Sequence, residues 1–182
     1  MMLKKIIQKY SYAFCLLVLS KNIYAAGSGT NPFSVTASVG QICSISTTTP
    51  LAFALYDPVG ANATVPLNAI GQISVACSKG AFGLTIGMGD GSHVIGAQRN
   101  MIGGTSSNLL QYNIFQPVSN LDNALCSFPG SIPWNSLGAG LLTLTSAPAN
   151  TARIYNVCGT ITAGQDVAVD SYSDIVTASI NF

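Results

Sequence analysis

Residues 172–182 read YSDIVTASINF, and apolar side chains alternate with polar ones through this stretch. One face carries Val176, Ala178, Ile180 and Phe182. Alternation with a period of two predicts a strand with one buried face. No strand follows in the sequence, so we expect one edge of its sheet to lack a neighbour, and an open apolar edge invites pairing. We interpret these four residues as the edge strand of an acceptor groove.

A second alternating stretch, FSVTASV at residues 33–39, follows a Gly/Ser-rich leader over residues 26–31 that we expect to be mobile. Its apolar face consists of Phe33, Val35, Ala37 and Val39. We interpret it as a donor strand that fills the groove of another copy. Burial of that face would contribute roughly 5–9 kcal/mol, comparable with the net stability of a domain, about 5–15 kcal/mol. The alternative is that this stretch pairs within its own domain as an ordinary first strand.

The composition is that of a folded β domain. The chain has 182 residues, of which 48% are hydrophobic and 7% charged, so it can fill a core and is not disordered. Turn signals recur about every 8–12 residues, which indicates a single all-β sandwich. We expect strands at residues 33–39, 41–46, 51–55, 70–77, 82–86, 109–115, 141–145, 152–162, 167–169 and 172–182. Residues 87–104 and 126–140 read as irregular connections.

The N-terminus has the features of a secretory signal. Three lysines within the first nine residues precede an apolar run over residues 13–19, and a cleavage site follows at Ala25. The apolar run is too short for a membrane anchor. We therefore expect a signal peptide over residues 1–25, a donor segment over 26–39 and a sandwich domain over 40–182. The mature chain keeps three basic residues against six Asp, a formal charge of −3, which argues against nucleic acid and anionic lipid as partners.

Four cysteines remain after removal of the signal: Cys43, Cys77, Cys126 and Cys158. An even number in an exported chain predicts two disulfides. Three pairings are possible, and we favour Cys43–Cys77 with Cys126–Cys158, because nearest-neighbour pairing staples each half of the domain. A zinc site is disfavoured, because the sequence has no Cys-x-x-Cys and a single histidine, His93.

No catalytic constellation, cofactor site or metal site is predicted. Asp90, Ser92 and His93 lie within four positions, too close in sequence to face one another as a triad, and read as a Gly-rich hairpin tip. Aspartates recur at every fourth residue from 166 to 174, but a strand would splay them, which disfavours a calcium site. We assign no catalytic residue and expect no enzyme.

Several short pieces, in this order and spacing, resemble one known family. They are Phe33-Ser-Val-x-Ala-x-Val39, Cys43-Ser-Ile45, Leu51-Ala-Phe53, Tyr56-Asp57-Pro58, Ile73-Ser-Val-Ala-Cys77, Arg99-Asn-Met101, Leu109-Leu-x-Tyr112, Ala163-Gly-Gln165 and Tyr172-Ser-Asp-Ile-Val176. The chain resembles a spore coat protein U domain, the domain used by subunits of archaic (Csu-type) chaperone–usher pili. The resemblance covers nearly the whole mature chain. It departs from the family pattern at Ala54 and Asn135, where the family often has Gly.

The resemblance implies an incomplete immunoglobulin-like β-sandwich that is completed by donor-strand complementation. Its implied partners are a periplasmic pilus chaperone, an outer-membrane usher and other pilus subunits. The implied location is the periplasm and then a cell-surface pilus that supports adhesion or biofilm formation. The alternative is a self-contained, secreted β-sandwich that forms a coat or binds a ligand. A secreted hydrolase is a third hypothesis, against which the absence of a triad counts.

Overall fold

The computed structural model describes residues 27–182, which form an all-β protein, as the sequence predicts. Its strands are β1 (Cys43–Thr49), β2 (Leu67–Cys77), β3 (Thr85–Met88), β4 (Arg99–Gly103), β5 (Leu109–Phe115), β6 (Leu142–Thr143), β7 (Arg153–Ile161), β8 (Tyr172–Ser173) and β9 (Ala178–Asn181). The helical content of this range is one short 3₁₀ turn, η1 (Gly138–Gly140). The predicted signal peptide lies outside the described residues. From residue 27 onward, nothing helical is long and apolar enough to cross a membrane.

Six strands form the larger sheet, in the order β1-β2-β7-β5-β4-β8, with every neighbouring pair antiparallel. The longest strands, β2 and β7, pair from Leu67 opposite Ile161 to Val75 opposite Arg153. Alternation places Ile73, Val75 and Cys77 of β2 on the buried face. These residues form a strand because this one face is apolar over the whole length.

The smaller sheet has the order β6-β3-β9 and covers one part of the larger sheet. The core lies between the two sheets, where Leu84, Ile86 and Tyr155 are completely buried. Trp134 is buried as well, and its indole N–H donates a 2.9 Å hydrogen bond to the carbonyl oxygen of Ile86. That bond satisfies the polar atom of the largest core side chain, as burial requires.

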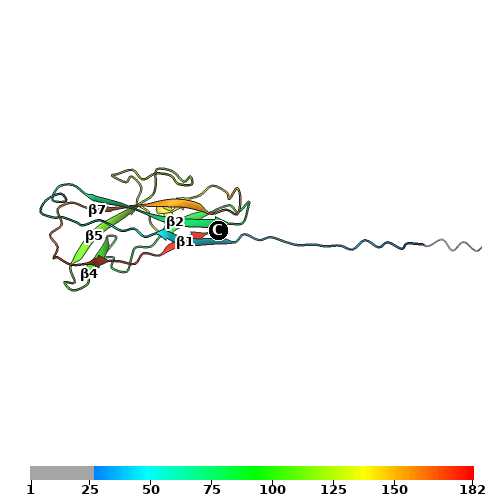
Figure 1. Cartoon of the computed structure of the whole chain (residues 1–182), viewed down its shortest axis with the longest axis horizontal. Coiled ribbons are helices and arrows are strands. Elements are labelled where there is room, and N and C mark those ends of the chain that lie inside the picture. The colour runs from blue at the N-terminus through cyan, green and yellow to red at the C-terminus, as the bar shows by residue number, and fades with distance from the viewer. Residues whose placement is uncertain (1–26) are drawn as a thin grey trace, which may run out of the picture. The chain divides into compact units, whose positions relative to one another are not determined.

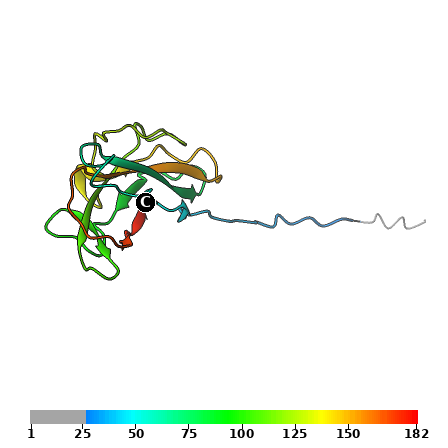
Figure 2. The same cartoon turned by 60° about the vertical axis from the view of Figure 1, so that its left-hand side comes forward.

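Two edge strands of the different sheets, β1 and β9, each have a hydrogen-bonded neighbour on one side. The start of β1 and the C-terminus lie next to each other at one end of the sandwich, here called the β1 end (Figures 1 and 2). The opposite end of the sandwich is here called the far end. Ile102 of β4 pairs there with Leu109, the first residue of β5, and the next residue, Gly103, pairs with Tyr172. Tyr172 therefore lies at the far end. The outer edges of β1 and β9 therefore border the same side of the sandwich.

The final stretch differs from the prediction of one continuous strand. Tyr172 and Ser173 pair with β4 in the larger sheet, whereas residues 178–181 pair with β3 in the smaller one. Between them the chain crosses from one sheet to the other, and the carboxylate of Asp174 is held by side chains and backbone N–H groups at the crossing. Alternation continues through the crossing, which is why the sequence does not reveal it.

Three other predictions about strands were wrong. Residues 51–55 and 167–169 form no strand, although both alternate, because neither has a hydrogen-bonded partner strand. The predicted connection at 87–104 contains β4, whose buried residues include Arg99 and Asn100. Both are polar, with Arg99 on the inner face opposite Tyr112 and Asn100 on the other face opposite Gln111, so a hydrophobic pattern does not reveal this strand.

Both disulfides in the structure follow the nearest-neighbour pairing. Cys43–Cys77 joins the first residue of β1 to the last residue of β2, and Cys126–Cys158 joins the irregular connection after β5 to the middle of β7. Each bridge therefore ties one flank of the sandwich to a central strand.

The chain divides into two units, and the boundary places the described residues 27–37 in the first and residues 38–182 in the second. No strand is formed by residues 27–42. Phe33, Val35 and Val39 are almost fully exposed, and Ala37 is also exposed. The alternating stretch thus leaves its apolar face uncovered.

Candidate functional site

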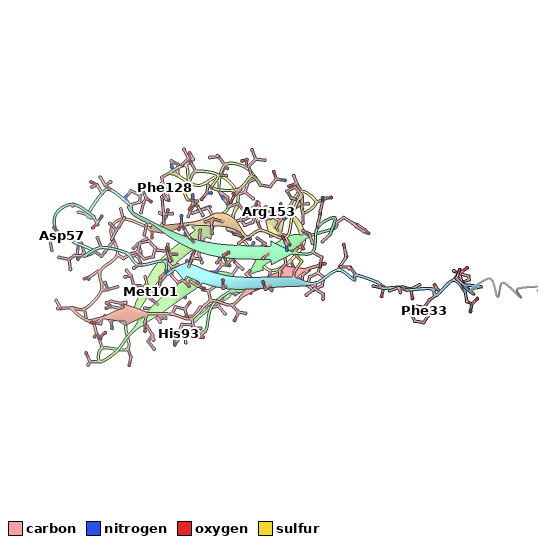
Figure 3. The ribbon with its side chains drawn as sticks, turned by 45° about the vertical axis from the view of Figure 1, so that its right-hand side comes forward. Phe33, Asp57, His93, Met101, Phe128 and Arg153 are labelled. Atoms are coloured by element: carbon pink, nitrogen blue, oxygen red, sulfur yellow. A yellow bond between two sulfur atoms is a disulfide. The ribbon has the colours of Figure 1, made fainter. Side chains whose placement is uncertain are left out.

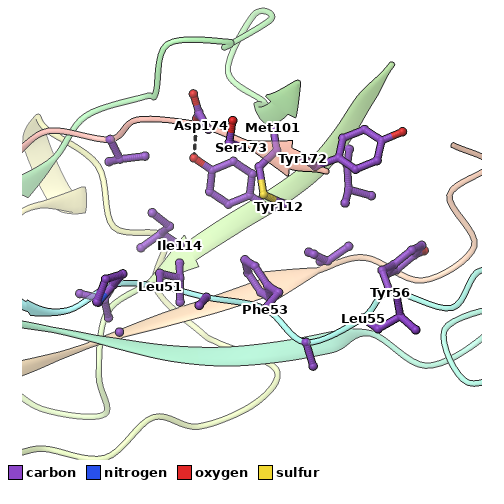
Figure 4. A pocket seen from close by; sticks show the side chains of 18 of the residues that line it. Leu51, Phe53, Leu55, Tyr56, Met101, Tyr112, Ile114, Tyr172, Ser173 and Asp174 are labelled. Atoms are coloured by element: carbon purple, nitrogen blue, oxygen red, sulfur yellow. Dashed lines mark hydrogen bonds between the residues drawn. The ribbon is translucent and has the colours of Figure 1, made fainter. Parts of the chain in front are cut away.

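A groove of about 700 Å³ opens on the side of the sandwich between residues 47–58, which comprise the end of β1 and the segment after it, and residues 167–178, which lead into β9. Its floor is the inner face of the larger sheet, and Figure 4 shows β5 crossing it with Tyr112 and Ile114. Other floor residues are Ile73, Leu110, Val157 and Ile161. These side chains belong to the hydrophobic core, so the groove opens directly onto it.

The first wall of the groove is the segment that follows β1, residues 49–56 (Figure 4). Leu51 and Phe53 point inward and are half-buried, whereas Leu55 is exposed. A side chain at Gly159 of β7 would collide with both Leu51 and Phe53, so this glycine lets the wall lie close to the sheet. The segment has inward-facing apolar residues but no ladder of backbone hydrogen bonds, which is the state of a strand that lacks a partner.

The opposite wall is the last segment of the chain, where Tyr172, Val176 and Ala178 line the groove. These side chains are half-buried and pack against the core. Beyond them β9 bonds to β3, and its other edge has no strand beside it within residues 27–182. The groove is therefore an apolar slot in which residues 49–56 of the first wall and the outer edge of β9 at the end of the second lack a partner strand.

The charged side chain of Asp174 lies in the lining of the slot and is only 2% exposed. Its Oδ2 accepts a 2.6 Å hydrogen bond from the hydroxyl of Tyr112, and its Oδ1 accepts one of 2.9 Å from the backbone N–H of Ser92. Nδ1 of His93 lies 3.0 Å from the same Oδ1. Gly91, at φ +87°, leaves room for the carboxylate, because a side chain there would overlap Asp174. One buried carboxylate thus fixes the crossing of the last segment to the β3–β4 connection and to β5.

The ionisation of this cluster follows from its contacts. Burial alone would raise the pKa of Asp174, but hydrogen bonds from Tyr112, the N–H of Ile175, His93 and the N–H of Ser92 lower it below its ordinary value. Burial, together with the bond to the Asp174 carboxylate, raises the pKa of Tyr112. The carboxylate is therefore ionised and the phenol neutral at neutral pH, which is the combination that makes their hydrogen bond strong.

Two further carboxylates hold the loops at the far end of the groove. Oδ2 of Asp170 accepts bonds from the backbone N–H groups of Ser106, at 2.6 Å, and Thr105, at 2.8 Å, and these lower its pKa. The N–H groups of Gly60 and Ala61 bond to the carboxylate of Asp57 and lower its pKa in the same way. Both aspartates act as caps for turns.

The predicted edge-strand residues are divided between groove and core. Val176 and Ala178 line the groove, Ile180 packs against the core without lining the groove, and Phe182 is 54% exposed at the β1 end. The sheet crossing causes this division, because β9 begins only at Ala178.

Sequence reasoning missed the other wall and the polar anchor. It treated residues 51–55 as an ordinary strand and gave no role to Tyr112 or Asp174. The signal that was available in the sequence is the pair of alternating stretches at 51–55 and 172–178, which are both apolar on one face.

Asp90, Ser92 and His93 form no catalytic arrangement, since His93 bonds to Asp174 and Ser92 contributes its backbone N–H. The aspartates at 170 and 174 each bind separate loops. In the described part of the chain no three His, Cys, Asp or Glu side chains are placed to hold a metal ion.

The family model of the Spore Coat Protein U domain matches residues 29–179. The chain belongs to the Spore Coat Protein U domain family. This confirms the resemblance seen in the sequence. Among curated relatives, this family member is similar to "Protein U" of Myxococcus xanthus, with 32% identity over 168 residues, which is 86% of this chain and 87% of that protein.

A solved structure is similar to this Spore Coat Protein U domain with 23% identity and a TM-score of 0.49. It is described as the CsuC–CsuE chaperone–tip adhesion subunit pre-assembly complex from archaic chaperone–usher Csu pili of Acinetobacter baumannii. The match covers 80% of this chain and 41% of the solved chain, so the chain spans about two fifths of its length.

Proposed function

We propose that this protein is a structural subunit of a chaperone–usher pilus, which polymerises when the N-terminal segment of one copy fills the groove of the next. The observation that carries the proposal is the groove itself, an apolar slot that opens onto the core between residues 49–56, which have no partner strand, and the last segment, which ends in the free edge of β9. Exposed apolar surface that is continuous with a core marks a binding site. An added strand would lie between the two walls, bury its side chains in the slot and reach the free edge of β9 at Ala178.

The N-terminal stretch fits that slot in length and pattern. Phe33 to Val39 spans six residue steps, as does the wall from Tyr172 to Ala178, and each is about 20 Å when extended. The stretch alternates, so Phe33, Val35, Ala37 and Val39 would enter the slot together while the residues between them face outward. Their exposure in the single chain is consistent with a segment that has its partner elsewhere.

In this proposal a periplasmic chaperone first covers the groove, and an outer-membrane usher mediates the exchange for the segment of the next subunit. Membership in the family and the two disulfides of an oxidising compartment support an exported subunit. A role of the assembled pilus in surface adhesion or biofilm formation is part of the same proposal. We propose no catalytic activity for this chain.

The test compares inward and outward substitutions in the donor segment of the full chain. Val35→Asp places a charge on the face that would be buried, and we expect it to abolish polymers seen by electron microscopy and light scattering. Thr36→Asp places the same charge on the opposite face and should leave polymerisation intact. A chain that begins near Gly40 should still bind a chaperone and accept a peptide of residues 30–39, but should not extend a polymer. Polymers of the Val35→Asp protein, or a stable closed monomer of the unaltered chain, would contradict the proposal and favour a self-contained coat or ligand-binding protein.

A further inference from the structure

The residues that connect the N-terminal segment to β1 are bound to the domain. The Ser78 hydroxyl donates a 3.0 Å hydrogen bond to the carbonyl oxygen of Gly40 and accepts one of 3.2 Å from the N–H of Ile42. The backbone N–H of Ser78 also donates to the carbonyl oxygen of Ile42, at 2.9 Å. Oε1 of Gln41 accepts a 2.7 Å bond from the N–H of Phe82. Residues 40–42 are thus held at the β1 end and are not a free tether.

Two large apolar side chains stand beside this connection without cover. Ile42 is 70% exposed and Phe82 is 67% exposed, and the backbone of Phe82 is bonded to the residue next to Ile42. We call Ile42 and Phe82 the linker patch. Lys79, which is exposed, lies in the connection between β2 and β3, as does Phe82.

The far end of the groove carries a second uncovered apolar set. Leu55, Val59 and Val169 are 89%, 91% and 104% exposed, and Leu55 and Val169 belong to the lining of the groove. We call these three residues the far-end patch. Beside it lies a cavity of about 210 Å³ lined by Pro58, Val59, Gly164, Gln165 and Asp166. Asp57 and Asp166 are exposed there, so the charge at this end is opposite to that of Lys79 (Figure 3 labels Asp57).

We propose that consecutive copies touch through a second contact outside the groove, in which the linker patch of one copy packs on the far-end patch of the next. The inference rests on the proposed function. Val39 would occupy one end of the neighbouring groove, and Ile42 follows three residues later, at most about 10 Å away. Because Gly40 and Ile42 are bound to their own domain, the domains themselves must meet at that end of the groove.

The direction of the donor segment decides which end that is. If the segment runs antiparallel to β9, Val39 lies at the far end of the groove, and the β1 end of one copy faces the far end of the next. This contact joins two different surfaces, so it repeats along an open filament. A parallel segment would bring two β1 ends together, at the place from which the accepting copy's own N-terminal segment leaves. The antiparallel arrangement is therefore the one that lets every copy both donate and accept.

Cross-linking tests the contact in the polymer of the full chain. We expect a chain with Phe82→Cys and Val59→Cys to form disulfides between consecutive copies on mild oxidation, visible as a ladder on non-reducing gels. The control carries Phe82→Cys and Ile95→Cys, because Ile95 is an exposed apolar residue outside both patches, and it should give no ladder. Equal ladders from both proteins, or none from the first, would overturn the proposal.

Dissociation kinetics provide a second readout that does not depend on cysteine chemistry. Ile42→Ser with Phe82→Ser should make polymers dissociate about tenfold faster or more, whereas Ile95→Ser should not change the rate. Lys79→Asp should accelerate dissociation about 2- to 5-fold, and Asp166→Lys in the same chain should restore the original rate. Unchanged rates would overturn the contact.

Binding of a synthetic peptide of residues 30–39 separates the two proposals. The peptide lacks the linker patch, so the substitutions at 42, 79 and 82 should not alter its affinity. If the peptide binds the chaperone-released chain while the cross-link and the rates show no contact, the second contact is wrong and the proposed function stands. If neither the peptide nor another copy binds, both fail together.

Discussion

The hydroxyl of Tyr112 donates a 2.6 Å hydrogen bond to Oδ2 of Asp174, and this bond joins the floor of the groove to its wall. Tyr112 belongs to β5 in the larger sheet, and Asp174 lies where the last segment crosses to the smaller sheet. At this point one polar contact therefore ties the wall to the floor within a mostly apolar lining.

We expect Asp174→Asn to lower the free energy of unfolding by about 1.5–3 kcal/mol, because it weakens charge-assisted hydrogen bonds inside the protein. Tyr112→Phe removes only the hydroxyl and leaves Asp174 its bonds to Ser92 and His93, so it should cost less. Urea denaturation followed by tyrosine and tryptophan fluorescence measures both. A smaller loss for Asp174→Asn than for Tyr112→Phe would mean that the carboxylate does not organise the crossing.

Acid should destabilise the protein. The pKa values of Asp57, Asp170 and Asp174 are lowered in the folded chain, so the stability that they provide is fully present above the unfolded aspartate pKa of about 3.9. It is lost as the pH falls through their folded values. We expect unfolding midpoints in urea that change little between about pH 7 and about pH 5 and then fall below about pH 4. Asp170→Asn should reduce the decrease of the midpoint at low pH. A midpoint that rises on acidification would contradict the lowered pKa values of these aspartates.

Substitution of Gly91 should lower the stability of the protein by more than its positive φ alone accounts for. Gly91 and Gly96 both have positive φ, +87° and +62°, but a side chain at 91 would overlap the Asp174 carboxylate, whereas nothing lies within 4 Å of one at 96. Gly96→Ala should cost about 1–2 kcal/mol, and Gly91→Ala clearly more. Thermal unfolding of the two proteins checks this, and equal losses would show that the β3–β4 connection can yield without moving Asp174.

A charge in the groove should block complementation without unfolding the chain. Ala178 lines the slot and its neighbour Thr177 is exposed, so Ala178→Asp and Thr177→Asp differ in whether a bound segment would bury the charge. We expect Ala178→Asp to weaken binding of the residue 30–39 peptide by about 2–3 kcal/mol or more, and Thr177→Asp to bind normally. Calorimetric titration measures both affinities, and equal affinities would place the occupant elsewhere.

Loss of either disulfide should be costly. The bridges close loops with sequence separations of 34 and 32 residues, and the chain-entropy relation gives each about 3–4 kcal/mol. Replacing Cys43 and Cys77 together with Ala should therefore lower the midpoint of thermal unfolding about as much as replacing Cys126 and Cys158. A much smaller effect at one pair would show that the reduced chain keeps structure in that loop.

The sequence predicts most of the fold because its strands have one apolar face. β5 was predicted to the residue, and β2 and β7 nearly so, since their inward positions are occupied by large apolar side chains. β4 was not predicted, because its buried residues Arg99 and Asn100 are polar. Hydrogen bonds, and not hydrophobic packing, stabilise their buried positions. Arg99 alone donates to the carbonyl oxygens of Met88, Gly89 and Trp134.

The candidate site is only half visible in the sequence. Alternation at 172–182 and 33–39 predicts an open edge and a segment to fill it, but it does not reveal that the chain changes sheets at Asp174. That crossing depends on contacts between residues about 60 to 80 positions apart in sequence, such as Tyr112 with Asp174 and Ser92 with Asp174. Periodicity describes neighbours along the chain and carries no information on such pairs.

The disulfide between Cys43 and Cys77 also has a mechanical consequence. A tensile force applied through the N-terminal segment reaches the domain at Gly40, which is hydrogen-bonded to Ser78. The force then acts on the Cys43–Cys77 bond before it acts on the hydrogen bonds between β1 and β2. The bond transmits the load from the edge strand into β2, so β1 cannot be peeled away one hydrogen bond at a time. A fibre built from such units would stretch or bend at the junctions between domains while each domain stays intact.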